Sequence, residues 1–219
     1  MKIILTGATG MVGEGTLHTI LQRNDVEEVL SVSRKPSGIS HPKLREILVD
    51  NFYDLTPIQN QFSGFDAVLF CLGISSVGLP KDEYYKITYT LTLHFAEIFH
   101  HQNPQGKFCY ISGAGTDSNE KGSGWSAVKG KTENDLIKIF GKNAYCFRPG
   151  FIKPLDGDMK RVNKYYKYVN WMYPLGRKFY AKGFTTNEEL ATAMTNVAKN
   201  GYQKPILEGD DIIKAAGTS

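Results

Sequence analysis

Three glycines, Gly7, Gly10 and Gly13, lie three residues apart near the start of the chain. They follow the apolar run Ile3-Ile4-Leu5 and precede a segment whose apolar residues recur at helical spacing. Residues without a Cβ let the backbone turn tightly from a strand into a helix and approach a pyrophosphate closely, and the helix N-terminus offers N–H groups to that phosphate. The motif predicts a dinucleotide site, with a tight turn that binds no ligand as the alternative.

Strand-like and helix-like segments alternate along the chain, which is typical of a parallel sheet covered by helices. Helices are predicted over residues 11–23 and 81–101. Two more are predicted to begin near residue 124 and at the capping-box sequence that starts at Thr186. No linker divides the 219 residues, so we expect one α/β domain: a doubly wound parallel sheet of the Rossmann type in three layers, α/β/α. The strands are predicted over residues 2–6, 28–33, 44–49, 66–71, 107–112 and 143–147.

The second predicted strand ends at Ser33-Arg34-Lys35, about 20 residues after the last glycine. An NAD-specific site of this kind usually has an acidic side chain here, against the ribose hydroxyls. This chain has none, and Arg34, with Ser33 and Lys35, would instead bind a 2′-phosphate through charge-assisted hydrogen bonds. The sequence therefore favours NADP over NAD, with a solvated charge at a strand end as the alternative.

Further candidates follow the third and fourth strands, because the carboxyl ends of parallel strands meet at the edge of the sheet where ligands bind. Asp50 and the run Cys71-Leu72-Gly73 would flank the adenine and its ribose there, or be ordinary loop residues. The cofactor contacts predicted from these patterns are Gly7, Thr9, Gly10, Met11, Val12, Gly13, Ser33, Arg34, Lys35, Asp50, Cys71, Leu72 and Gly73.

Five stretches carry a family resemblance: residues 6–13, 71–73, 112–115, 128–133 and 147–150. In them the chain resembles the atypical short-chain dehydrogenases/reductases, the NAD-dependent epimerase/dehydratase-like proteins, and within these the Tat-interacting-protein type of oxidoreductase. The resemblance implies a Rossmann fold with the cofactor across the carboxyl edge of the sheet. It adds Lys129, Pro149, Gly150 and Phe151 to the expected cofactor contacts.

The resemblance also implies a catalytic serine, tyrosine and lysine. In the family the serine polarises a carbonyl, the tyrosine donates a proton, and the lysine holds the nicotinamide ribose and lowers the tyrosine pKa. Ser112 matches the serine and Lys129 the lysine, but Trp125 stands at the tyrosine position. An indole N–H can donate a hydrogen bond but cannot ionise in the range of a general acid.

Two functions follow from this departure. The first is an NADP(H)-dependent oxidoreductase or epimerase-like enzyme that acts on a small carbonyl or hydroxyl substrate. The alternative is a redox sensor or scaffold that binds NADP(H) without turnover. Tyr84 and Tyr85 are candidates for the missing acid, although core packing or a partly exposed aromatic ring is the favoured interpretation of either.

A basic and aromatic stretch runs from Met159 to Lys182, with seven Lys or Arg, seven aromatic residues and no acid. We expect residues from about 150 to 185 to form a helical segment over the substrate cleft. An anionic substrate or an acidic membrane surface would also suit this charge. Nucleic-acid binding is not expected, because no recognised motif accompanies the charge and the formal net charge is only +4.

Other residue patterns set further expectations. The three cysteines show no CxxC spacing, and no histidine has another ligand at metal-binding spacing, so we expect free thiols and no metal site. No signal peptide and no membrane-spanning run is evident, so the chain is expected to be soluble and cytoplasmic, with a small-molecule substrate. An oligomer is compatible with the sequence.

Overall fold

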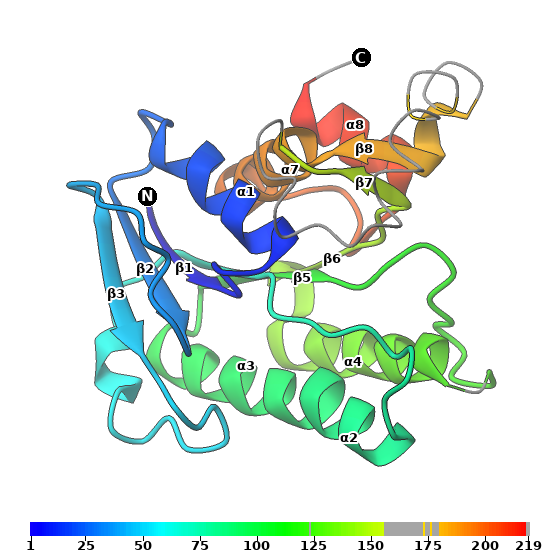
Figure 1. The fold of residues 1–219 in the computed structure, drawn as a ribbon, viewed down its shortest axis with the longest axis horizontal. Helices are drawn as coiled ribbons and strands as arrows, with labels where there is room; N and C mark the ends of the chain where they lie inside the picture. Colours follow the sequence, from blue (N-terminus) through cyan, green and yellow to red (C-terminus); the bar gives the residue numbers. More distant parts are fainter. Residues whose placement is uncertain (123, 156–172, 174–175, 177–179, 218–219) are drawn as a thin grey trace.

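The computed structural model describes the chain from residue 1 to 217 except residues 123, 156–172, 174–175 and 177–179. Its centre is a seven-stranded parallel sheet in the order β3-β2-β1-β4-β5-β6-β9 (Figure 1). The chain proceeds outward from β1 to β3, returns to the centre, and proceeds the other way from β4, which confirms the predicted doubly wound fold. The strands are β1 Lys2–Thr6, β2 Glu28–Ser33, β3 Leu44–Leu48, β4 Ala67–Phe70, β5 Lys107–Ile111, β6 Ala144–Phe147 and β9 Ile206–Leu207.

Helices cover both faces of this sheet, as Figure 1 shows, with α1, α7 and α8 on one face and α2, α3 and α4 on the other. The three layers agree with the prediction. The bounds are α1 Met11–Leu21, α2 Lys81–Tyr85, α3 Leu91–Gln102, α4 Trp125–Phe140, α7 Asn187–Asn200 and α8 Gly209–Ala216. Short helical turns lie at η1 Gln59–Phe62, η2 Lys86–Thr90, η3 Gly141–Asn143 and η4 Ala181–Gly183.

The central strands are apolar on both sides because helices cover both faces of the sheet. In β1 the side chains alternate between two cores: Ile3 and Leu5 pack with α1 and α7, whereas Ile4 packs with α3. The alternation follows from the two-residue period of a strand. The core therefore fixes the carboxyl edge of the sheet, where β1, β2, β4 and β5 end side by side.

Three predicted segments differ in detail. α1 ends at Leu21 rather than at residue 23, and the helix predicted over residues 81–101 is divided by the π-helical turn η2. Within residues 150–185, β7 Phe151–Lys153 pairs in parallel with β8 Phe184–Thr186, so these described parts are strand and not helix. Most of the basic and aromatic stretch lies outside the described residues. The capping box at Thr186 is present at the start of α7, as predicted.

Candidate nucleotide and catalytic site

The glycine turn joins β1 to α1 by close backbone contacts. Gly7 has a φ of +72°, and a Cβ there would lie 2.7 Å from the backbone of Cys71. A Cβ on Gly13 would lie 2.0 Å from the Gly7 carbonyl oxygen, to which the Gly10 N–H also donates at 2.9 Å. The N–H groups at the very start of α1, at Met11, Val12 and Gly13, precede the first bond of the helical pattern, which the Glu14 N–H donates to the Gly10 carbonyl, and they can receive an anion.

A cavity of about 500 Å³ opens beside this turn, within the size range of cofactor sites. It is called the nucleotide cavity below, after the site predicted at this turn. Four segments contribute to it: the turn after β1, the end of β2, the loop after β3, and the loop after β4. It is lined by Gly7, Thr9, Gly10, Ser33, Arg34, Lys35, Pro36, Phe52, Cys71, Leu72 and Gly73. The structure therefore brings together most of the predicted cofactor contacts.

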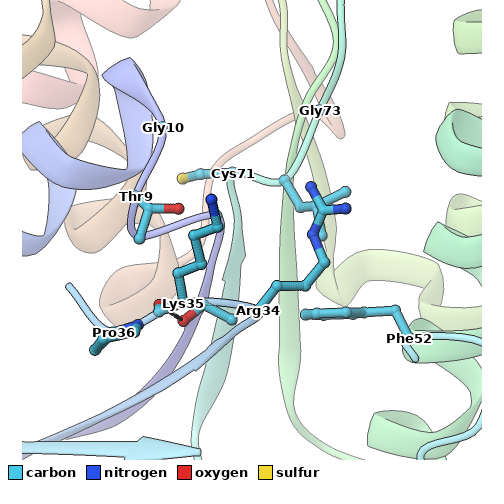
Figure 2. A pocket seen from close by; sticks show the side chains of 11 residues that line it. Thr9, Gly10, Arg34, Lys35, Pro36, Phe52, Cys71 and Gly73 are labelled. Carbon is cyan, nitrogen blue, oxygen red and sulfur yellow. Dashed lines mark hydrogen bonds between the residues drawn. The ribbon is translucent and has the colours of Figure 1, made fainter. Parts of the chain in front are cut away.

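The end of β2 gives the cavity a positive wall. Figure 2 shows the Arg34 and Lys35 side chains extending into the cavity between the Thr9–Gly10 turn and Phe52. The buried Ser33 hydroxyl donates to the Lys35 carbonyl at 2.6 Å and so fixes the turn from which both cations project. None of the residues that line this cavity is acidic.

Some predicted contacts lie elsewhere, and two lining residues were not anticipated. Asp50 lies in a separate hollow beside β3, together with Leu48 and Asn51. Phe52, two residues further on, lines the nucleotide cavity instead, as does Pro36. Asp50 and Phe52 follow the same strand end but line different hollows, because the position of an individual loop side chain depends on how the loop folds back.

The segment after β6 is held in place by other parts of the chain. The Pro149 carbonyl accepts a hydrogen bond from the Ala114 N–H at 2.9 Å. A Cβ on Gly150 would lie 2.4 Å from the Gly183 carbonyl oxygen, and the Phe151 ring lies 5.8 Å from the Phe184 ring. Pro149, Gly150 and Phe151 are not among the residues lining the nucleotide cavity, and neither are Met11, Val12, Gly13 and Lys129.

Ser112 follows β5 and is 4% exposed. Its hydroxyl donates to Glu133 Oε1 at 2.5 Å, and its oxygen also lies 3.1 Å from the Phe147 carbonyl. The Lys129 ammonium donates to the Ser112 carbonyl. The two residues are therefore in contact, but the Ser112 hydroxyl is directed at a buried carboxylate.

That carboxylate belongs to a charged network under the site. Glu133 is fully buried and forms a two-pronged pair with Arg148, with Nε to Oε1 at 3.0 Å and Nη2 to Oε2 at 2.5 Å. Arg148 also donates to the Ser118 hydroxyl at 2.5 Å and to Glu208 at 3.2 Å. The network joins the end of β5, the middle of α4 and the end of β6, and sequence spacing gave no signal for it.

Burial lowers the pKa of Lys129 from 10.5 to about 8, and the negative charge of Glu133 opposes part of that shift. The unfolded chain keeps this proton up to about pH 10.5, so between pH 8 and 10.5 the unfolded state binds more protons. Stability should therefore rise with pH in this window as the penalty for burying the charge disappears.

We expect urea unfolding to show this as a difference between wild type and Lys129→Met. Between pH 8 and 10.5 the free energy of unfolding of the wild type should rise by roughly 2–3 kcal/mol relative to that of the variant. The exposed Lys121→Met serves as the control and should follow the wild type. A difference between wild type and Lys129→Met that stays constant over this window would contradict the buried, shifted ammonium.

Trp125 is the first residue of α4 and is 37% exposed. Its ring covers the loop after β5, since a Cβ on Gly115 would lie 3.6 Å from a ring carbon. Of the two tyrosines considered as substitutes, Tyr84 is buried, and burial raises its pKa. Tyr85 is 36% exposed, with its ring 4.9 Å from that of Tyr89.

The three cysteine thiols are best explained as packing residues. Cys71, Cys109 and Cys146 are all free, and burial raises the pKa of each thiol. Within the described residues, no three His, Cys, Asp or Glu side chains gather as metal ligands. In that same part of the chain, no helix combines the length and the apolar character needed to cross a membrane.

One family model and three known proteins resemble this chain. Residues 3–123 match the model of the NAD dependent epimerase/dehydratase family. Protein FMP52, mitochondrial, from Debaryomyces hansenii is 24% identical over all of this chain and 96% of its own length. Uronate dehydrogenase from Agrobacterium tumefaciens superposes with a TM-score of 0.66 at 14% identity, over 95% of this chain and 76% of that one. The Bordetella bronchiseptica enzyme WbmH, in complex with NAD+, gives 0.63 at 16% identity, over 91% and 72%.

Proposed function

The chain belongs to the NAD dependent epimerase/dehydratase family, and on this premise we propose that it is an NADP(H)-dependent oxidoreductase or epimerase-like enzyme. Its substrate would be a small carbonyl or hydroxyl compound. The observation that carries the choice of NADP is the wall at the end of β2, where Arg34 and Lys35 line the cavity and no lining residue is acidic. A dianionic 2′-phosphate fits that charge, whereas free ribose hydroxyls usually meet a carboxylate.

Each part of the dinucleotide has a candidate partner. The first turn of α1 would bind the pyrophosphate through backbone N–H groups, and the Phe52 ring would pack against the adenine. Arg34 and Lys35 would bind the 2′-phosphate, and Lys129 the nicotinamide ribose. When bound, the nicotinamide supplies or accepts a hydride.

The catalytic end of the site is proposed to work through Lys129. Its ammonium already donates to the Ser112 carbonyl, and its lowered pKa makes it able to exchange a proton near pH 8. Because the Ser112 hydroxyl is engaged by Glu133, the geometry supports Ser112 as a positioning residue for Lys129 more than as a direct partner of a carbonyl. Trp125 would contribute a surface rather than a proton.

Calorimetric titration of the wild type and Arg34→Ala with NADPH and NADH tests the proposal. Losing a charge-assisted hydrogen bond to phosphate should weaken NADPH binding by about 10- to 100-fold, and NADH binding by less than about threefold. Arg45→Ala is the matched control, because Arg45 lies on β3, pairs with Glu28 and does not line the cavity. Equal binding of NADH and NADPH to the wild type would contradict the choice of NADP.

Turnover is a separate question from binding. Tight NADPH binding with no oxidation across a broad screen of carbonyl compounds would favour a sensor or scaffold. The cytoplasmic location and the possible oligomer stay predictions, and the mitochondrial name of the Debaryomyces hansenii relative offers a different compartment to test.

A further inference from the structure

A second cavity, of about 420 Å³, lies between the loop after β4, α2 and the start of α4. We propose that it is the substrate subsite of this protein, and that it selects an uncharged aromatic or aliphatic carbonyl compound over a polyhydroxylated or nucleotide-linked one. The assignment as a substrate subsite rests on the proposed function. The apolar selectivity rests on the cavity itself.

The wall of this cavity is mainly apolar and aromatic. Leu79 enters from the loop, Tyr84 and Tyr85 from α2, and Trp125 and Val128 from the first turn of α4. A sugar placed against such a wall would leave its hydroxyls without partners, which costs free energy for each buried polar group. An aromatic or aliphatic ligand would instead remove apolar surface from water.

Two aromatic side chains of the wall are partly exposed to solvent, which supports the cavity as a ligand site. Trp125 and Tyr85 are 37% and 36% exposed, although both line a concave site. Large aromatic rings left open to water in a cavity are typical of ligand sites. The charged groups at the rim, Lys81 and Asp82, have opposite signs, so the cavity carries no net charge that would attract an anionic substrate.

The position of the cavity connects it to the catalytic end. Cys71–Gly73 lines the nucleotide cavity, and the same loop continues through Leu79 into the apolar cavity. Leu79 of this connection and Trp125 of α4 line the same cavity, so the connection lies against the start of α4. Trp125 lies one helical turn before Lys129, whose ammonium contacts the end of β5. A ligand in the apolar cavity would therefore lie next to the residues proposed to bind the nicotinamide ribose.

Trp125, which stands where the family has its catalytic tyrosine, is also part of the wall of the apolar cavity. The indole is larger and more apolar than a phenol, and it lies between the loop after β5 and the cavity. We assign Trp125 to substrate selection: its ring forms one side of the subsite. The π-helical turn η2 directly follows Tyr85, and such turns occur frequently at functional sites.

Equilibrium binding of an aromatic ketone, acetophenone, and a hydroxylated ketone, dihydroxyacetone, tests the assignment on the full chain by calorimetry and tryptophan fluorescence. Acetophenone should bind at least about tenfold more tightly than dihydroxyacetone or UDP-glucose. Trp125→Phe should largely abolish the change in fluorescence, and it should weaken the calorimetric affinity for acetophenone by at least about threefold, because the smaller ring buries less apolar surface against the ligand.

Two variants of the same loop locate the binding. Leu79→Asp places a carboxylate in the wall and should weaken acetophenone binding at least about tenfold. Val77→Asp is the control, because Val77 is 89% exposed and is not a lining residue, and its affinity should stay within about twofold. Circular dichroism and NADPH titration of both variants check that each remains folded.

The outcomes separate this inference from the proposed function. Equal or tighter binding of dihydroxyacetone or UDP-glucose, or no effect of Leu79→Asp, would overturn the apolar subsite while NADPH binding stands. Failure of NADPH to bind the wild type would overturn the proposed function, and with it the assignment of the cavity to a substrate of that reaction. If acetophenone bound to a wild type that does not bind NADPH, the apolar selectivity of the cavity would stand, but its assignment as a substrate subsite would not.

Discussion

Arg148→Met is expected to reduce the free energy of unfolding by about 3–5 kcal/mol. The substitution keeps an unbranched side chain but removes the two-pronged pairing of the Glu133 carboxylate, whose side chain is fully buried. The Ser112 hydroxyl would be its remaining hydrogen-bond partner among the contacts described above. One hydroxyl and the nearby Lys129 ammonium do not replace a two-pronged ion pair, so the cost comes from the poorly compensated buried charge more than from the lost bonds.

Urea unfolding measures this effect, and Arg45→Met provides the matched control. Arg45 pairs with Glu28 at 3.3 Å on the exposed edge of the sheet, where its loss should cost no more than about 1 kcal/mol. The double variant Glu133→Leu/Arg148→Met removes both charges and should recover much of the stability. Equal losses for the two single arginine variants would show that the buried network contributes no more than a surface pair.

The two later glycines of the nucleotide turn should respond differently to alanine. Gly13→Ala would place a Cβ 2.0 Å from the Gly7 carbonyl oxygen, so α1 must move away from the turn. Gly10→Ala meets the same oxygen only at 3.4 Å and has an extended backbone that alanine adopts readily. We therefore expect Gly13→Ala to lower the free energy of unfolding by about 1–3 kcal/mol. Gly10→Ala should lower it by less than about 1 kcal/mol.

Binding should separate the variants a second time. Gly10 lines the nucleotide cavity, so its added methyl group should weaken NADPH binding by at least about tenfold although the protein remains stable. Gly13→Ala should lose both stability and NADPH affinity. Thermal unfolding with and without NADPH reports both quantities, because a bound ligand raises the melting temperature of the folded state. A stable Gly13→Ala protein with unchanged affinity would refute the packing role given to that glycine.

Much of the fold could be predicted because its signals are local. Each of the six predicted strands agrees with the structure to within one residue at each end, since apolar runs bounded by loop residues mark strands buried on both faces. Helix α8 was also not predicted, whereas the three missed strands have weak local signals: β9 has two residues, and β7 and β8 have three each. The π-helical turn η2 was missed because apolar spacing hardly changes over one turn.

The candidate site was predictable where a motif fixes the backbone and less so where distant side chains meet. Arg34 and the glycine turn lie at one cavity because both sit at the ends of neighbouring strands. Phe52 enters the same cavity from a loop, and the contact between Glu133 and Arg148 depends on the packing of α4 against β6. Spacing along the chain does not encode such contacts.

The connection from β4 to α2 makes one short piece of chain part of two cavities, with Cys71–Gly73 at one and Leu79 at the other. Whatever conformation of this connection the dinucleotide favours is also the conformation presented to the second ligand. Thermodynamic linkage then makes the influence mutual: a cofactor that improves substrate affinity by some factor has its own affinity improved by the same factor. If the proposed function holds, a substitution in this connection that leaves the sheet unchanged would therefore alter the affinities for both ligands together.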